Sequence, residues 1–482
     1  MDNVKKDLAS GVFWSAIEKY SSLAISIIIT MVLARLLSPD DYGVIAIATV
    51  IIYFLQLLCT MGIGPAVVQK KDLSETDINN IFSFTIYLGL ALSGLFFLSS
   101  YFIASFYNND VLLIVCQILV LQVFFGALNM VPNALMLKDK RFKVIAKRTV
   151  VLQVSTGVLA IIAAFTGMGV YSLLISPILT SIGCYIWNRI YYKLLFKPLF
   201  STSSIKKIFS YSLYQFLFDF VNYFSRNLDK LLIGKFLSFE NLGYYEKSYR
   251  LMQLPLQNVS RVISPVLQPV LSDYQNELNF LCDKYEKVIR YIAFVSFPLG
   301  LILFSCSYEI IAIFYGSQWY NAVPSFKILA ISVPLQLILS TTGGVYQSCN
   351  ATKNLFYVGL RNSSMTIAGF VIALYLKGTI EAVSWGWTLT SFLCFVSSFY
   401  ELYKRVFCLP MIRLLKLLYF PFLSMLISYA SILCIELILP DNIIISIIVK
   451  GLVVVCLSLM LIQYTGQFDL IGFIEKSIKN KK

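Results

Sequence analysis

The sequence predicts an all-α membrane protein with about fourteen transmembrane helices. Hydrophobic residues make up 58% of its 482 residues and charged residues only 13%, whereas a soluble chain carries roughly 25% charged residues. Apolar stretches of ~20 residues, long enough to cross a bilayer as a helix, recur along the whole length. Lys and Arg gather in alternate breaks between these stretches, which is typical of cytoplasmic loops.

The expected helices follow one another closely, and the breaks hold turn-forming residues such as Ser38-Pro39 and Asn108-Asn109. Their ranges are 12–37, 42–66, 79–106, 111–136, 144–166, 169–195, 207–236, 241–270, 285–314, 321–348, 354–376, 379–403, 412–438 and 442–466. The first range lacks an A-x-A-like cleavage site, so we expect a retained helix rather than a removed signal peptide.

The distribution of cations gives the orientation. When the N-terminus is placed in the cytoplasm, the inner breaks hold most Lys and Arg, and the clear outer cations are Arg35, Lys235 and Lys377. One missed helix would invert every later loop, so this asymmetry supports the helix count and predicts that both termini are cytoplasmic. Inner loops also account for the net charge of +14, and we expect no nucleic-acid partner.

The composition gives little support for catalysis or metal binding. The ten cysteines are scattered singly, no C-x-x-C pair occurs, and the chain has no His. Disulfide frameworks, zinc sites and His-based catalysis are therefore disfavoured. We assign no catalytic residue and no metal ligand.

An internal repeat divides the chain. The turn after the first expected helix resembles the turn after the seventh, and a segment of the sixth helix, 179–184, resembles 389–394 in the twelfth. Six helices is an even number, so both units share one orientation, as in parallel-repeat transporters with a path between the lobes. The matching pairs are Arg35 and Lys235, Leu37 and Leu237, Ser38 and Ser238, Asp40 and Glu240, Gly43 and Gly243, Ile63 and Ile263, and Pro65 and Pro265.

The repeat predicts four parts. A first lobe spans residues 1–195, a second lobe 207–405, and two extra helices with a cytoplasmic tail 406–482. The connector 196–206 mixes Lys with Phe, Leu and Ile, which fits an amphipathic segment on the inner membrane surface or a plain cytoplasmic loop.

Charged residues inside the expected spans indicate function, because each costs ~3 kcal/mol at the centre of a membrane helix. In range 207–236 a polar stripe on one helical face includes Asp219, Arg226 and Asp229, with Lys230 adjacent. In range 241–270 the stripe is Glu246, Arg250, Gln253, Gln257 and Arg261. The first helix adds Glu18 and Lys19.

Two interpretations of these charges remain open. They pair among themselves along their own helices, or they line a wet cavity where the expected helices 1, 7 and 8 meet. We favour the cavity, whose excess of cations suits a phosphate or diphosphate held by Arg. By contrast, Lys327 and Lys450 read as lone cations that reach the membrane interface. Tyr245 and Tyr249 are candidates for stacking on sugar rings.

The sequence resembles the Wzx-type polysaccharide or O-antigen flippases of the multidrug/oligosaccharidyl-lipid/polysaccharide exporter superfamily. The similarity lies in Gly11-Val-Phe-Trp-Ser15, Leu33-Ala-Arg-Leu-Leu-Ser-Pro-Asp-Asp-Tyr-Gly43, Leu228-Asp-Lys-Leu-Leu-Ile-Gly-Lys-Phe-Leu237 and Leu242-Gly-Tyr-Tyr245. The resemblance covers nearly the whole chain. It implies two six-helix bundles around a central, often cationic cavity, with two extra helices at the C-terminal end.

The resemblance implies a flippase that moves undecaprenyl-diphosphate-linked oligosaccharide across the bacterial inner membrane by alternating access, for O-antigen, capsule or exopolysaccharide synthesis. We expect the diphosphate to bind Arg226, Lys230, Arg250, Lys19 and Arg261, and Glu18 or Asp219 to carry a coupling proton or sodium ion. No other cofactor is expected. The partners would be lipid-linked oligosaccharide, membrane lipid, and the polymerase and glycosyltransferases of the same pathway.

Two alternatives are weighed against this function. A cation-coupled drug antiporter of the same superfamily calls for an acidic cavity, whereas this charge set is net basic. A membrane glycan polymerase or lipid-linked glycosyltransferase usually carries a sizeable outer loop with catalytic residues, and every outer turn expected here is only a few residues long. We therefore predict a transporter and not an enzyme.

Overall fold

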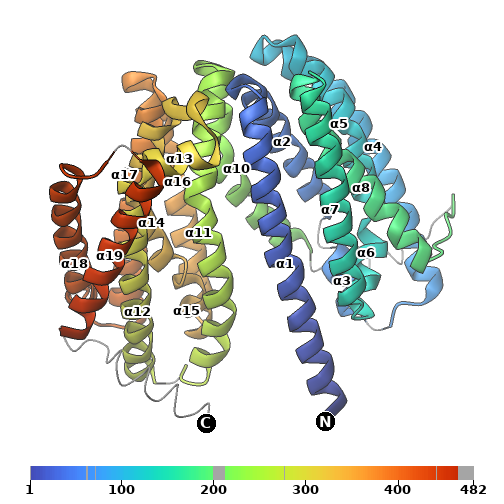
Figure 1. The fold of residues 1–482 in the computed structure, drawn as a ribbon. Helices are drawn as coiled ribbons and strands as arrows, with labels where there is room; N and C mark the ends of the chain where they lie inside the picture. Colours follow the sequence, from blue (N-terminus) through green and yellow to red (C-terminus); the bar gives the residue numbers. More distant parts are fainter. Residues whose placement is uncertain are drawn as a thin grey trace. The chain divides into compact units, whose positions relative to one another are not determined.

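The computed structural model describes residues 2–60, 63–70, 72–198, 212–275, 277–440 and 442–464. These residues form helices joined by short turns, and no strand occurs among them (Figure 1). The chain divides into two compact units, residues 1–243 and 244–482. The all-α class predicted from composition is confirmed.

The first unit is built from long helices, with the short helices α3 and α6 and the 3-10 turn η1 between them. α4 packs on α5, α1 packs on α7, α7 packs on α8, and α10 packs on α2. The bounds are α1 (Asp2–Leu36), α2 (Pro39–Thr60), α3 (Ile63–Gln69), α4 (Glu75–Tyr107), α5 (Asp110–Leu128), α6 (Met130–Lys138), α7 (Phe142–Phe165), η1 (Gly169–Tyr171), α8 (Ser172–Tyr191) and α10 (Ser212–Phe236).

α11 (Phe239–Ser272) starts in the first unit and continues into the second. In the second unit α16 packs on α17, α12 packs on α14 and α18, and α18 packs on α19. The bounds are α12 (Leu278–Ser305), α13 (Ser307–Phe314), η2 (Ser317–Ala322), α14 (Val323–Leu339), α15 (Thr342–Ser348), α16 (Thr352–Lys377), α17 (Ile380–Glu401), η3 (Leu402–Val406), α18 (Ile412–Glu436) and α19 (Ile443–Tyr464).

The helix ends follow from local sequence. Ser38 and Asp41 exchange hydrogen bonds at the start of α2, with the Ser38 N–H 3.0 Å from Asp41 Oδ2 and the Asp41 N–H 3.2 Å from Ser38 Oγ. Between α4 and α5, Asn108 adopts a left-handed conformation, and Asn109 Oδ1 accepts from the Leu112 N–H. The turn residues recognised in the sequence therefore end these helices as expected.

Twelve helical stretches in the described residues are long and apolar enough to cross a membrane. They correspond to the predicted spans except 207–236 and 241–270, which correspond to α10 and α11. Those two helices carry the charge stripes and are less apolar, but each is long enough to span a bilayer. The predicted count of about fourteen is thus close, with twelve helices apolar enough by composition.

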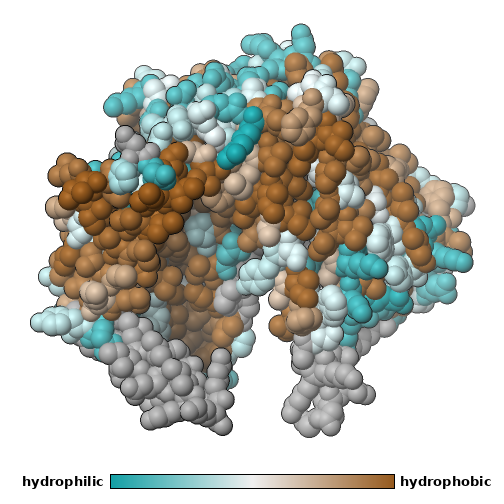
Figure 2. Space-filling model, viewed as in Figure 1, coloured by the Kyte–Doolittle hydropathy of each residue, from teal (hydrophilic) through white to brown (hydrophobic). Residues whose placement is uncertain are grey.

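Large hydrophobic side chains are exposed along the outer faces of several helices. On α4 they include Leu95, Leu98 and Phe102, and on α18 they include Tyr419 and Phe422. Figure 2 shows hydrophobic residues over much of the visible face. Side chains of this kind are stable when lipid rather than water surrounds them, so the chain is a multi-pass membrane protein.

The second predicted lobe begins at residue 207, whereas the first compact unit extends to residue 243 and includes α10. α10 packs on α2 and α4. The connector 196–206 falls mostly on residues 199–211, which lie outside the described part of the chain. The division into two six-helix lobes and a linker stays a prediction.

Candidate functional site

The charged stripe of α10 is attached to α2 by aromatic and polar contacts. The Tyr223 hydroxyl donates to the Val50 carbonyl, and the Phe224 ring packs on Phe54 with 5.1 Å between ring centroids. Farther along the helix Arg226 is exposed, Lys230 is half-buried and Asp229 is fully buried. α10 therefore holds the Arg226 guanidinium clear of the packed interface.

The polar residues of α1 are turned toward α7. Glu18 Oε1 accepts from Thr149 Oγ1 at 3.0 Å, and Ser22 Oγ donates to Gln153 Oε1 at 2.6 Å. Lys19, next to Glu18, is exposed. Glu18 is thus a half-buried carboxylate with a neutral hydroxyl donor, which leaves room on the carboxylate for a proton or a cation.

α11 contributes a buried aromatic stack and an exposed cation, Arg250. Tyr245 and Tyr249 are buried and stacked, with ring centroids 6.0 Å apart, and the Tyr249 ring packs against Trp387 of α17 at 5.4 Å. Lys247 is buried over the rings of Tyr315 and Trp319. Arg250 is exposed.

The predicted site residues are shared between the two units. Glu18, Lys19, Arg226 and Lys230 belong to the first unit, on helices with different neighbours, and Tyr245, Tyr249 and Arg250 belong to the second. The side chains of Asp219 and Arg261 lie outside those that the structure describes. The binding roles of all these residues therefore remain predictions.

The structure adds a polar cluster around Arg148, which is not among the predicted site residues. Arg148 of α7 is 5% exposed, and it donates from Nη1 to Asn188 Oδ1 at 2.5 Å and from Nη2 to Asn133 Oδ1 at 3.2 Å. Asn188 Nδ2 donates to Asn129 Oδ1 at 2.6 Å. Within the described residues Arg148 has no carboxylate partner, and its Nε is buried without an acceptor. The sequence signal that could have found this cluster is the presence of Asn129, Asn133 and Asn188 in or beside apolar helices.

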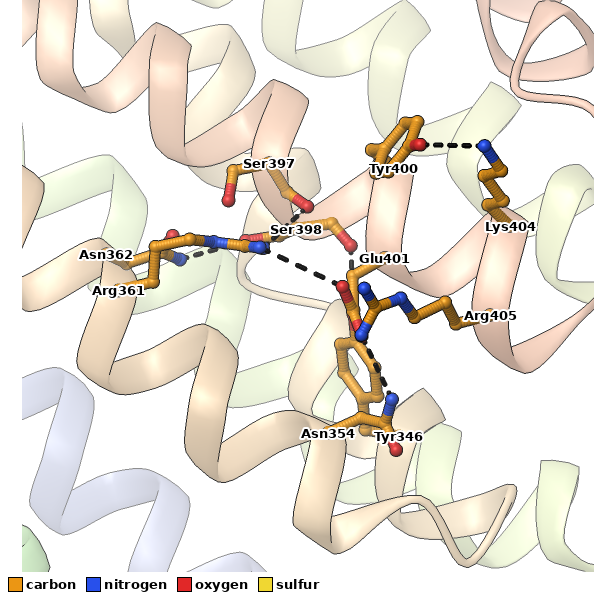
Figure 3. Close-up of polar contacts among 10 residues, drawn as sticks. All are labelled: Tyr346, Asn354, Arg361, Asn362, Ser397, Ser398, Tyr400, Glu401, Lys404 and Arg405. Carbon is orange, nitrogen blue, oxygen red and sulfur yellow. Dashed lines mark hydrogen bonds and ion pairs between the residues drawn. The ribbon is translucent and has the colours of Figure 1, made fainter.

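A second cluster surrounds Glu401 in the second unit. Glu401 is buried at the end of α17, 3.3 Å from Arg405 and 3.8 Å from Arg361, and Oε1 accepts from Asn354 at 3.0 Å (Figure 3). Arg361 also donates to the Ser397 carbonyl at 3.0 Å. The carboxylate therefore joins α16 to α17 through charged hydrogen bonds.

Each cluster includes a residue that lies four positions past one of the matched cysteines. Asn188 follows Cys184 by four residues, and Ser398 follows Cys394 by four. Arg148 of α7 donates to Asn188 of α8, and Asn362 of α16 donates to Ser398 of α17 at 2.8 Å. Both contacts join a helix to the next helix in the chain, and the parallel repeat stays a prediction.

Lys450 is not the lone interfacial cation that the sequence suggested. It is 7% exposed and lies 2.8 Å from Glu309 of α13 and 2.8 Å from Glu436 of α18. Ser446 Oγ donates to Glu309 at 2.5 Å. The expectation was wrong because Lys450 and Glu309 are 141 residues apart in sequence and meet only when α19 packs on α13.

The fold defines a multi-pass, all-helical membrane protein. A family described as polysaccharide biosynthesis protein matches residues 32–324, and the chain belongs to that family.

Curated relatives are similar over most of the chain. It is 26% identical to the teichuronic acid biosynthesis protein TuaB of Bacillus subtilis (strain 168), over 82% of each chain. It is 22% identical to the lipopolysaccharide biosynthesis protein WzxC of Escherichia coli (strain K12), over 89% of this chain and 88% of that one.

Among solved structures, the lipid II flippase MurJ in an inward closed conformation superposes with a TM-score of 0.74 and 16% identity. The match covers 95% of this chain and 100% of MurJ. At this identity the likeness shows a common fold, and the resemblance recognised in the sequence is confirmed by the family and the relatives together.

Proposed function

We propose that this protein is a flippase that moves a lipid-linked oligosaccharide between the leaflets of a bacterial cytoplasmic membrane. Membership of the polysaccharide biosynthesis protein family is the observation that carries the proposal. The curated relatives are named for the synthesis of teichuronic acid and lipopolysaccharide, and MurJ is named a lipid II flippase. The substrate would be an undecaprenyl-diphosphate-linked glycan, with its lipid tail left in the bilayer.

Arg226 and Arg250 are the proposed diphosphate ligands, together with Lys19, Lys230 and Arg261. Exposure of the Arg226 and Arg250 side chains on charged helices supports this role, because Arg binds phosphate oxygens through two parallel hydrogen bonds. Tyr245 and Tyr249 would contact sugar after a conformational change that opens their ring contacts with each other and with Trp387. Glu18 or Asp219 would carry a coupling proton or sodium ion.

The test is glycan export in cells that lack their own flippase and express this chain. Arg226→Ala and Arg250→Ala should each lower surface glycan at least ten-fold at unchanged protein level in the membrane. Arg226→Lys should retain partial export, because Lys keeps the charge but loses the bidentate geometry.

Lys377→Ala, at an exposed cation of α16, is the matched control and should export normally. Normal export by both Arg226→Ala and Arg250→Ala would reject these residues as diphosphate ligands. Failure of the unmutated chain to restore export with any lipid-linked glycan offered would reject the flippase function itself.

A further inference from the structure

Two glycines at equivalent positions of the repeat sit against backbone rather than against side chains. A Cβ atom added at Gly43 would lie 2.5 Å from the carbonyl carbon of Phe239 and nearer still to its oxygen. A Cβ atom added at Gly243 would lie 2.7 Å from the carbonyl carbon of Pro39, again nearer to the oxygen. Real Cβ atoms do not approach other atoms below 3.0 Å, so only glycine permits either contact.

The two contacts are reciprocal. Gly43 is four residues past Pro39, the first residue of α2, and Gly243 is four residues past Phe239, the first residue of α11. Each glycine therefore lies against the carbonyl of the other helix's first residue. This is the arrangement of a two-fold contact, in which residue i meets j and j meets i, and all four residues belong to the first unit.

The surroundings of the glycines are closely packed. Leu37, Tyr42 and Leu242 are buried, and a Cβ at Gly234 would lie 2.7 Å from the Ile47 side chain. Small residues let helix backbones approach this closely, and the contact then rests on van der Waals attraction, which falls steeply with distance. Such a contact weakens steeply when the two helix starts move apart, so it favours the position in which they touch.

Each of the two helix starts carries an acidic residue. The N-terminal ends of α2 and α11 carry partial positive charge, and the exposed acids Asp40 and Glu240 offset it. The four residues at the contact, Pro39, Gly43, Phe239 and Gly243, have no charged side chain of their own.

We propose that this reciprocal glycine contact is the closed outer gate of the transporter. The proposal rests on the flippase function and on the predicted orientation, which places the turns at residues 38 and 238 outside. In the closed state Gly43 and Gly243 bring the starts of α2 and α11 together, and transport to the outer leaflet requires them to part.

The first experiment replaces each glycine with alanine. Alanine has the higher helix propensity, so a loss of function cannot come from a weakened helix. Gly43→Ala and Gly243→Ala should each lower surface glycan at least ten-fold at unchanged membrane level. Gly94→Ala and Gly359→Ala are matched controls, because a Cβ at either would meet nothing within 4 Å. Normal export by both test variants overturns the gate.

The second experiment does not depend on the folding of the glycine variants. Asp40→Cys and Glu240→Cys are combined in a chain without its native cysteines and treated with a bifunctional methanethiosulfonate. The cross-link should form and block export. Export should return when a reductant cleaves the linker. Each single variant should export glycan under all of these conditions.

Either of two results overturns the proposal: no cross-linked product, or cross-linked protein with normal export. Export by the untreated double variant must be measured first. If the unmutated chain exports no glycan, the flippase function fails, whereas the cross-link alone still reports whether the two helix starts meet.

Discussion

Arg148 holds a full positive charge in a nearly solvent-free position among α6, α7 and α8. Neutral Asn oxygens are its acceptors, so the guanidinium is hydrogen-bonded but its charge is not balanced by a carboxylate in the described residues. Burial of a charge with incomplete compensation costs several kcal/mol. The cluster is therefore sensitive to the loss of any one partner.

Replacing Asn188 with Leu should destabilise the first unit by about 1–3 kcal/mol, because Arg148 then loses its 2.5 Å acceptor in a buried position. The double variant Arg148→Met/Asn188→Leu should recover part of that loss, since the buried guanidinium is gone and only the neutral amides of Asn133 and Asn129 lose a donor. Thermal unfolding in detergent measures both. A double variant less stable than Asn188→Leu alone would contradict this account.

Glu18 is the described carboxylate proposed to couple transport to an ion gradient. Glu18→Gln keeps the acceptor oxygen for Thr149, which lies 3.0 Å away, but removes the titratable group. Export by this variant should become insensitive to collapse of the proton or sodium gradient. Export of the unmutated chain should fall when the coupling gradient is removed. An unchanged gradient dependence in Glu18→Gln would exclude Glu18 as the coupling group.

At the scale of elements, α19 is held to α13 and α18 by one buried cation. Lys450 lies 2.8 Å from each of Glu309 and Glu436, and it also donates to the Ser305 carbonyl at 3.3 Å. Glu309 is 5% exposed, so it depends on this lysine for its charge balance. The last two helices are thus fastened by an ion triad as well as by apolar packing.

Lys450→Met should destabilise the protein by about 3–5 kcal/mol, because it leaves Glu309 buried without its cation. Limited proteolysis in detergent should then cleave the segment between α17 and α18 faster than in the unmutated protein. Lys327→Met is the control at a more exposed lysine of α14 and should show little change. Equal proteolysis of Lys450→Met and the unmutated chain would show that the triad does not fasten α19.

At the scale of the whole molecule, the charge asymmetry predicts which ends of the helices face the cytoplasm. Lys353 and Lys377 are exposed at opposite ends of α16. In a chain without native cysteines, an impermeant maleimide should label Lys377→Cys in intact cells, and Lys353→Cys only after the cells are opened. The reverse pattern would show that both termini lie outside.

The sequence identified the charged helices but not the contacts of their side chains. α10 and α11 were found because charges interrupt otherwise apolar stretches, which is a local property. That Arg226 and Arg250 are exposed while Lys247 and Asp229 are buried depends on neighbouring helices. A helical stripe narrows the choice of face, but the packing decides which members of the stripe remain accessible.

Hydropathy and capping residues by themselves determined an all-α membrane protein and its helix ends, because each acts over a turn or a single helix. Only the tertiary structure decided which distant residues meet. Arg148 contacts Asn188, 40 residues away, and Lys450 contacts Glu309, 141 residues away. Gly43 contacts the carbonyl of Phe239, 196 residues away. Their meeting depends on how whole helices pack, which no local pattern records.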